Sequence, residues 1–533
     1  MTRLTRRGFL ALATGTTMGG VWKRDTDQVR TFDVCLNPDA LEADPSLLPA
    51  VHTAGVSAVW LPGFFYGHWP YPLNVTRMYA EQLRKLGMEA YIIDLALGHP
   101  GDSLGAMKGN IPLTPPKHWR LGVRVNGTTY AGTSLHDPAV EENCAALRAI
   151  AKEGYRRVFL DDDFRLAQGP GMVGGCFCAQ HKELFLQSHG YSANQWPELL
   201  EDVNARRYTP LLRSWCDWNC HLLTSAFRAQ QKAAGNMKLG IMVMWMGAEK
   251  AGIRLRDYSG ALFRVGEGHF DDASLASEKG WTDELFSALF HRRFARAELS
   301  YSETTAFPAH ALSVANMAAK LTVSTIADVR TTCFMSGLSP FPKIYWHDLA
   351  PRMHKEARMH SIIAGHGMKG PVKLWWGLPG RYVSDDNPYS LAMALGIPFE
   401  MCRAQPTNGW IFLGDYDAME PPQTPIGANA AVICRPGVRS RWPNTQFVAE
   451  RLADLAALRQ RIVAAHPNMP HVVENAPVVL AWYPSAKAAI LWNLSRDAQS
   501  VTLKAGSITR SVALEPLGAE LLQGLPELAH LGF

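Results

Sequence analysis

Short apolar stretches alternate with longer segments of helical periodicity between residues 30 and 340. Eight of the apolar stretches have the length and composition of β-strands: residues 31–37, 57–64, 89–97, 156–164, 238–245, 261–268, 297–304 and 332–338. Between most of them apolar residues recur at helical spacing, as in 75–87, 139–154 and 312–328. This alternation predicts a (β/α)8 TIM barrel. A doubly wound open sheet is the alternative, although no glycine-rich phosphate loop follows the first strand.

The pattern changes after about residue 370. Residues 371–468 mix strand-like and helical stretches and predict a small α/β domain. Residues 469–533 alternate apolar and polar positions with a period of two and predict an antiparallel β-sandwich. The predicted fold class is therefore α/β, with a catalytic barrel over residues 29–370 followed by these two smaller domains.

Residues 1–28 have the composition of a signal segment. Arg6 and Arg7 precede Gly8, Phe9 and Leu10, and a mildly apolar stretch without acidic residues follows. This order is typical of a bacterial twin-arginine export signal and predicts a periplasmic or secreted protein. Beyond it no apolar run approaches the ~18 residues that a membrane span needs, so we expect none.

Composition limits the partners. The 533-residue chain is 47% hydrophobic and 19% charged, which favours a large buried core. Its net charge of +5 is spread out, and no basic block is interleaved with aromatic residues, so no nucleic acid partner is expected. The 9 cysteines are too few for a disulfide framework in a chain of this length.

Carboxylates stand at the ends of the fourth and seventh predicted strands. Asp161, Asp162 and Asp163 end the fourth, and Glu303 ends the seventh. Barrel enzymes place their sites at this end of the strands. Repulsion among adjacent carboxylates should raise the pKa of at least one, which suits a general acid, whereas a salt-bridged cluster is the structural alternative. Two carboxylates facing each other across a barrel mouth can bracket a glycosidic bond.

Aromatic and polar residues near the other strand ends favour a carbohydrate ligand. Sugar C–H faces stack on aromatic rings while hydroxyl groups need polar neighbours, although packing of long loops on the barrel rim is an alternative use of such residues. Glu267 is also the alternative nucleophile. The predicted substrate-binding residues are Asp161, Asp94, Trp60, Tyr66, His68, Trp245, Glu267, Trp346 and His347.

A Cys-x-Cys-x-x-His cluster follows the fourth strand. Cys176, Cys178 and His181 offer three zinc ligands within six residues, and Cys144 is a candidate for the fourth. We expect a structural zinc ion and no cofactor that catalysis requires. Reduced or disulfide-bonded thiols are the alternative.

The stretch from Asp162 to Phe185 resembles the corresponding segment of family 42 glycoside hydrolases, bacterial β-galactosidases of the large (β/α)8 retaining clan. In that family Asn-Glu-Tyr-Gly ends the fourth strand and a Cys-x-Cys-x-x-Cys zinc motif follows. The resemblance implies that Asp163 is the acid/base and Glu303 the nucleophile, with Asp162 at the position of the Asn. Asp-Asp replaces Asn-Glu here, so the acid is one methylene shorter.

These observations together predict an exported glycoside hydrolase that acts on a glycoside or an oligo- or polysaccharide, with Asp163, Glu303 and Asp162 as its catalytic residues. The resemblance further implies retention of configuration, galactosidase-like exo action and a homo-oligomer. One alternative is a carbohydrate-binding barrel without catalysis. Another is a metal-dependent barrel hydrolase, although no His-x-His ends the first strand.

Overall fold

The structure of the protein is a computed structural model, which describes residues 30–97, 107–108, 111–112, 114–161, 164–166, 169 and 171–527. The predicted signal segment 1–28 lies outside the described residues. Within them, no helix combines the length and apolar character that crossing a membrane requires.

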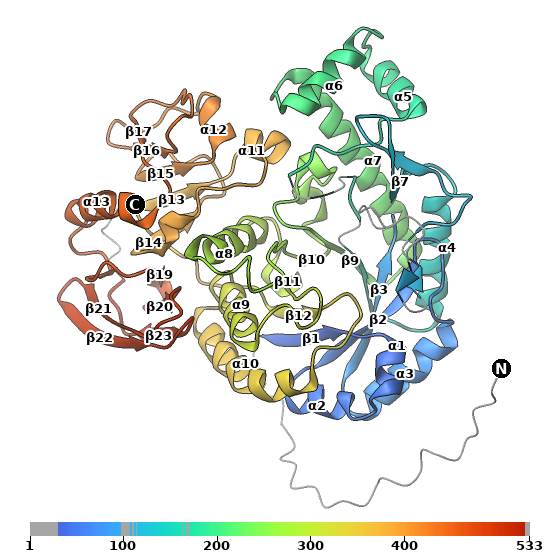
Figure 1. Ribbon diagram of the computed structural model, residues 1–533, viewed down its shortest axis with the longest axis horizontal. Coiled ribbons are helices and arrows are strands. Elements are labelled where there is room, and N and C mark those ends of the chain that lie inside the picture. Colours follow the sequence, from blue (N-terminus) through green and yellow to red (C-terminus); the bar gives the residue numbers. More distant parts are fainter. Residues whose placement is uncertain are drawn as a thin grey trace, which may run out of the picture.

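Eight parallel strands close into a barrel in the order β1-β12-β11-β10-β9-β8-β3-β2 (Figure 1). Closure is direct, because β1 pairs in parallel with both β12 and β2. The predicted barrel is therefore confirmed, and the open sheet is excluded. The strands are β1 Thr31–Cys35, β2 Ala58–Phe65, β3 Glu89–Leu95, β8 Arg157–Leu160, β9 Lys238–Met242, β10 Leu262–Arg264, β11 Ser300–Thr305 and β12 Thr331–Met335.

Helices surround the barrel and cover the outer face of its strands (Figure 1). Local capping fixes where several begin: the Thr209 hydroxyl accepts the Leu212 amide at 3.1 Å, and Pro210 occupies the first turn of the next helix. The helices that cover the barrel are α1 Pro38–Ala43, α2 Leu47–Thr53, α3 Leu73–Lys85, α4 Ala139–Lys152, α7 Pro210–Ala234, α8 Glu278–Arg292, α9 Val314–Ile326 and α10 Lys343–Ile363.

Alternation along the strands decides which side chains face the barrel interior. Trp60, Phe159 and Tyr301 pack together inside, with ring centroids 4.5 Å apart for Trp60–Phe159 and 4.8 Å for Phe159–Tyr301. Their strand neighbours, such as Val59 and Val158, face outward and join the core with the helices. The same alternation turns the inner residues at the strand ends toward the mouth.

The loops that follow β3 and β8 build an extra layer beside the mouth (Figure 1). A hairpin of β6 (Leu121–Val123) and β7 (Thr129–Thr133) follows β3, and its loop contains Asn126-Gly127, a pair that favours tight turns. A short pair of strands, β4 (Met107–Lys108) and β5 (Ile111–Pro112), precedes it. After β8 come α5 (Ala179–His189) and α6 (Gln195–Ala205), which pack on α7 through an aromatic cluster of Phe185, Trp196, Trp215 and Trp218.

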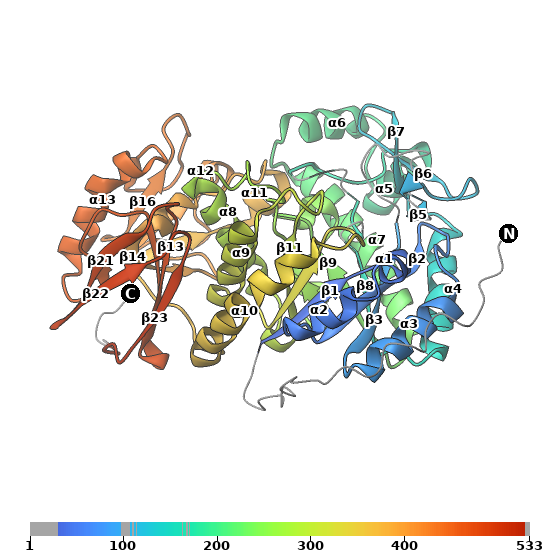
Figure 2. The ribbon, with the colours of Figure 1, turned by 60° about the horizontal axis from the view of Figure 1, so that its bottom comes forward.

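The C-terminal region packs against α8 and is built on one continuous sheet (Figures 1 and 2). Its order is β17-β16-β15-β13-β14-β19-β20-β23, parallel from β17 to β19 and antiparallel beyond. The β14–β19 pair joins the predicted α/β and sandwich regions across residue 468. The strands are β13 Val372–Trp375, β14 Leu395–Met401, β15 Trp410–Leu413, β16 Ala431–Cys434, β17 Thr445–Phe447, β19 Val478–Tyr483, β20 Ala488–Asn493 and β23 Ala519–Gln523.

A second, antiparallel sheet of β18 (His471–Val472), β21 (Gln499–Ala505) and β22 (Ile508–Leu514) packs on the end of this sheet. Apolar residues from both sheets, including Leu480, Trp482, Leu491 and Leu503, form their common core. This is the predicted β-sandwich, with one of its sheets extended into the α/β region. Helices α11 (Leu378–Val383), α12 (Asp415–Met419) and α13 (Leu452–Ala465) complete the region.

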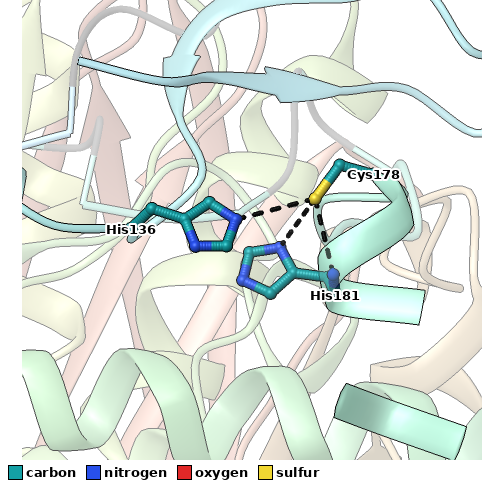
Figure 3. A group of neighbouring side chains, drawn as sticks. All are labelled: His136, Cys178 and His181. Carbon is teal, nitrogen blue, oxygen red and sulfur yellow. Dashed lines mark hydrogen bonds between the residues drawn. The ribbon is translucent and has the colours of Figure 1, made fainter. Parts of the chain in front are cut away.

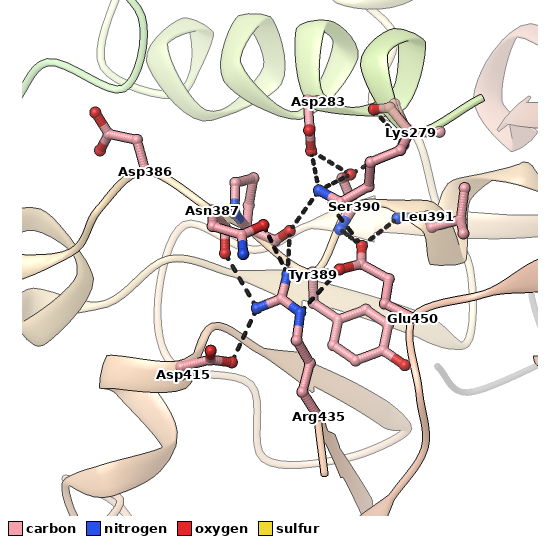
Figure 4. A network of polar contacts seen from close by, with 12 residues as sticks. Lys279, Asp283, Asp386, Asn387, Tyr389, Ser390, Leu391, Asp415, Arg435 and Glu450 are labelled. Carbon is pink, nitrogen blue, oxygen red and sulfur yellow. Dashed lines mark hydrogen bonds and ion pairs between the residues drawn. The ribbon is translucent and has the colours of Figure 1, made fainter. Parts of the chain in front are cut away.

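A polar network fastens the C-terminal region to the barrel (Figure 4). Arg435 donates to Glu450, to Asp415 at 2.8 Å and to the Pro388 carbonyl at 2.8 Å. Lys279 of α8 reaches the same Pro388 carbonyl at 3.1 Å. Because both cations bind one backbone oxygen, the segment around residue 388 is held from both sides.

Candidate active site

Two carboxylates flank a buried arginine inside the C-terminal end of the barrel. Arg264, the last residue of β10, places Nη2 3.3 Å from Oε1 of Glu303 on β11. The same Nη2 lies 3.8 Å from Oδ1 of Asp161, directly after β8. Arg264 lies two positions after Leu262, and Glu303 lies two positions after Tyr301. Since Leu262 and Tyr301 face the barrel interior, Arg264 and Glu303 face it too. The guanidinium thus compensates the negative charge of both carboxylates where little water reaches.

Both oxygens of the Glu303 carboxylate are held. Oε1 lies beside Arg264, and Oε2 accepts a hydrogen bond from the Glu267 amide at 3.3 Å. Glu303 is only 3% exposed, so its side chain is oriented before any ligand arrives. A carboxylate nucleophile needs such a fixed direction of attack.

The predicted acid/base Asp163 and its neighbour Asp162 lie outside the described residues, and both assignments stay predictions. The residues on either side are described. Asp161 donates its amide to the Asp94 carbonyl at 2.9 Å, and its carbonyl accepts the Phe164 amide at 2.7 Å. Asp161, the described one of the three predicted strand-four carboxylates, shares the Arg264 guanidinium with Glu303.

Glu267 lies behind the wall of the barrel. Its Oε2 is 3.0 Å from the Lys320 ammonium, which also lies 3.3 Å from Oε2 of Glu284. Lys320 belongs to α9 and Glu284 to α8, so this carboxylate points to the helices and is fully buried. Burial raises the pKa of Glu267 to about 8, against the opposing effect of Lys320. In this position Glu267 does not reach the mouth, where its predicted ligand or nucleophile role would place it.

Two further predicted ligand-binding residues are enclosed. Asp94 shares the outer face of β3 with Ile92 and accepts the Phe64 amide at 2.8 Å. Burial raises its pKa to about 7. Trp60 lies in the barrel interior and donates its indole N–H to Asp33 at 3.0 Å. Both side chains support the wall of the barrel.

The remaining predicted ligand-binding residues divide between the rim and helix α10. Tyr66 (buried) and His68 (half-buried) form the turn after β2, where the Phe65 amide donates to the His68 carbonyl at 2.8 Å. On α10, Trp346 packs against Phe334 with centroids 5.2 Å apart, and the side chain of His347 is 83% exposed. The buried Trp346 ring is part of the helix–strand core.

Trp245 forms a wall beside the mouth after β9. Its ring lies 5.2 Å from that of His269. It covers Gly268 so closely that a Cβ at that glycine would fall 2.4 Å from the indole. Its N–H donates at 3.3 Å to the carbonyl of Asp386, a residue of the C-terminal region. The wall is thus fixed from both domains.

Sequence reasoning missed Arg264 and Lys320. Each is a cation inside an apolar run, "LFRV" on β10 and "AAKLTV" on α9. A charge at such a position is rarely buried without a partner. A lone cation in an apolar run was therefore the sign that a charged partner exists. The sequence could not show which residues the partners are, because they lie far away along the chain.

Three side chains of the kinds that bind metal ions come together in the layer beside the mouth (Figure 3). The Cys178 sulfur is 3.6 Å from His136 Nε2 and 3.7 Å from His181 Nδ1, and the two imidazole rings stack with centroids 4.3 Å apart. These three ligand atoms lie within 4.8 Å of one another. Burial lowers the pKa of His181 to about 4, which leaves its ring neutral and able to bind a metal.

Two of the predicted zinc ligands, Cys178 and His181, belong to this group, and His136 is its third member. His136, before α4, was not predicted, because a single histidine 42 residues from Cys178 gives no local signal. Cys176, two residues before Cys178, is buried, and burial raises its pKa to about 12. Cys144 lies on α4 and, like Cys176, is not a member of the group of three found among the described residues.

No protein-family model matches the chain, and no curated protein matches it by sequence. Solved structures do match. The β-galactosidase from Bacillus circulans sp. alkalophilus superposes with a TM-score of 0.60 at 9% identity, covering 92% of this chain and 98% of that chain. The β-galactosidases from Rahnella sp. R3 and the psychrophilic Marinomonas ef1 each superpose with a TM-score of 0.57, at 9% and 10% identity and over 92% of this chain. These two superpositions cover 98% of the Rahnella chain and 99% of the Marinomonas chain.

The fold therefore places the protein among (β/α)8 barrels that carry a C-terminal β-rich region. More particularly, it is the fold of these β-galactosidases, over nearly the whole length of both chains. At such low identity the likeness shows the fold alone. The resemblance predicted from two short motifs is confirmed at that level.

Proposed function

We propose that the protein is a glycoside hydrolase whose active site lies around Glu303 at the C-terminal end of the barrel. One observation carries the proposal: the Glu303 carboxylate faces the barrel interior, oriented by Arg264 on one oxygen and the Glu267 amide on the other. The likeness of the fold to β-galactosidases supports the same reading.

In the proposed reaction Glu303 attacks the anomeric carbon and forms a glycosyl ester, while the bond to the leaving oxygen breaks. Asp163 gives its proton to that oxygen. Asp163 then takes a proton from water, which hydrolyses the ester and releases the sugar with its configuration retained. Arg264 compensates the charge that Glu303 carries before attack and regains when the ester breaks. Asp161, bound to the same arginine, supports this arrangement.

The proposed substrate is a terminal glycoside, and galactosides are the first to test because of the resemblance in sequence and fold. We also propose export through the twin-arginine segment at Arg6 and Arg7.

The test is hydrolysis of a panel of aryl α- and β-glycosides by the parent and by Glu303→Ala. We expect the variant to lose at least about 10³-fold in kcat. Added azide should restore turnover and yield a glycosyl azide, because azide can occupy the space of the missing carboxylate. The matched control is Glu298→Ala, an exposed glutamate just before β11, and should behave as the parent.

Full activity in Glu303→Ala, on any substrate that the parent cleaves, would refute the assignment of the nucleophile. Binding of sugars by the parent without any turnover would instead favour a carbohydrate-binding barrel.

We further propose that His136, Cys178 and His181 hold a structural zinc ion. Two imidazole nitrogens and a thiolate are suitable zinc ligands, and their clustering in the layer formed by the segments after β3 and β8 carries the proposal. Bound metal would brace the segment between β7 and α4, which carries His136, against α5. The purified protein should contain about one zinc per chain by elemental analysis, and His136→Ala should contain much less. Cys434→Ala, a buried cysteine of the C-terminal region, is the control and should keep its metal. Absence of zinc from the parent after growth with zinc would contradict the proposal.

A further inference from the structure

Three charged side chains are sealed between the barrel wall and its helices. The Lys320 ammonium lies 3.0 Å from Glu267 and 3.3 Å from Glu284, and it donates to the His269 carbonyl at 2.8 Å. All three side chains are 0% exposed. Taking charges out of water is costly, and well-packed apolar residues commonly give equal or greater stability. Stability alone therefore does not account for this cluster.

The cluster fixes the loop that leaves β10. Oε1 of Glu284 accepts two successive amides, from Gly268 at 2.8 Å and from His269 at 2.6 Å. A Cβ at Gly266 would fall 2.0 Å from the Trp245 carbonyl, so the loop is also packed tightly on its other side. The backbone of residues 266–269 is thereby held on both sides.

Glu267 connects this fixed loop to Glu303. The Glu303 amide donates to Oε1 of Glu267 at 3.2 Å, and the Glu267 amide donates to Oε2 of Glu303 at 3.3 Å. Each glutamate thus accepts the backbone N–H of the other through the barrel wall. Since Lys320 orients the Glu267 carboxylate, it also acts on the position of Glu303.

We propose that Glu267 and Lys320 are positioning residues for Glu303: without touching substrate, they set the direction of its carboxylate from behind the barrel wall. The proposal rests on the function proposed above. It assigns Glu267 a role in the rate of attack and none in substrate affinity.

The experiment compares two substitutions of Glu267. Glu267→Leu removes the acceptor of the Glu303 amide, whereas Glu267→Gln keeps an acceptor oxygen of the same reach. We expect Glu267→Leu to lose about 10²-fold in kcat with KM within threefold of the parent, since small misplacement of a reacting group has such an effect. Glu267→Gln should keep kcat within about threefold.

The matched control is Glu356→Leu. Glu356 is another buried glutamate with a pKa raised by burial, and it accepts two threonine hydroxyls, at 2.6 Å from Thr322 and 2.5 Å from Thr325. It lies on α10 and serves to measure what the loss of a buried carboxylate does to stability. All variants are assayed well below their own Tm. If Glu356→Leu loses as much kcat as Glu267→Leu, or if Glu267→Leu keeps the parent kcat, the proposal is overturned.

A second measurement separates this proposal from the function it rests on. Hydrogen exchange of the Glu303 amide should be faster in Glu267→Leu than in the parent, and close to the parent in Glu267→Gln, whatever the substrate. Labelling of Glu303 by 2-deoxy-2-fluoro glycosides, followed by mass spectrometry, reports its attack directly. Exchange that does not respond to Glu267→Leu overturns the positioning role. Changed exchange with no labelling in the parent supports positioning and refutes Glu303 as the nucleophile.

Discussion

The two faces of the barrel wall at β10 and β11 carry the same arrangement of charges. On the inner face Arg264 lies 3.3 Å from Glu303 and 3.8 Å from Asp161; on the outer face Lys320 lies 3.0 Å from Glu267 and 3.3 Å from Glu284. The outer carboxylates are 0% exposed, whereas the inner ones keep 4% and 9% of their side-chain surface. On the sealed outer face one cation between two carboxylates holds a backbone segment, and on the inner face the same arrangement holds Glu303, the carboxylate that we propose as the nucleophile.

The largest difference between the faces should appear when the outer cation is removed. Lys320→Met leaves two enclosed carboxylates without a counter-ion, and we expect the free energy of unfolding to fall by about 3–5 kcal/mol. Urea unfolding measures the loss. Lys343→Met, which removes an exposed partner of Asp44, should change stability by less than about 1 kcal/mol. Equal losses in the two variants would contradict the idea of a sealed cluster.

Removal of the inner cation should act mainly on the reaction. Arg264→Met leaves Glu303 and Asp161 without their counter-ion, but their side chains keep 4% and 9% of their surface exposed, so the little water that reaches them offsets part of the loss. We expect kcat/KM on the best glycoside to fall by about 10²-fold, and the free energy of unfolding to fall less than in Lys320→Met. If Arg264→Met loses more free energy of unfolding than Lys320→Met, the proposed difference between the two faces is wrong.

Two buried aspartates test whether the face of the wall affects proton binding. Asp33, inside the barrel, and Asp94, on its outer face, both have a pKa raised to about 7 by burial. In the unfolded chain such groups titrate near pH 3.9. Between pH 4 and 7 the folded form therefore keeps protons that the unfolded form loses, so stability falls as pH rises, by up to about 1.4 kcal/mol per pH unit for each group.

Asp33→Asn and Asp94→Asn should each remove one such contribution. Relative to the parent, both variants become more stable as pH rises from 4 to 7, and by similar amounts. Tm measured over this range gives the difference. A slope that changes in one variant only would show that surroundings other than burial control that aspartate.

The smallest effect is expected away from both faces. His347 is 83% exposed and pairs with Asp348, whose side chain is 47% exposed. Such surface pairs contribute about 0–1 kcal/mol, so His347→Ala should keep Tm and leave KM within about twofold of the parent. A clear rise in KM would instead support the substrate contact predicted from the sequence.

The barrel could be predicted because its signal is local. Most of the eight strands are short apolar runs, and Glu303 follows Tyr301 by two positions on the inner face, as strand periodicity requires. Glu267 had the same appearance as Glu303, a glutamate at a strand end. It lies beyond the three-residue strand β10, where alternation no longer indicates the face.

Long-range partners explain the other differences. Nothing near Lys320 or His136 in the sequence indicates the side chains they meet. Trp60 and Trp346 belong to the core, but an aromatic residue near a strand end has the same local pattern whether it packs inward or binds a ligand. The parallel pairing of β14 with β19 likewise depends on residues about 80 positions apart, and no turn sequence predicts it.

Because β19 pairs with β14, the C-terminal strands protect an edge of the sheet that β13 to β17 form. A chain that ended at residue 468 would keep β13 to β17 but would leave β14 with a row of unpaired N–H and C=O groups along an apolar, buried strand. Exposed edges of this kind pair readily with other chains. Truncation at this point should therefore produce aggregates instead of a smaller soluble protein, even though the barrel itself is complete.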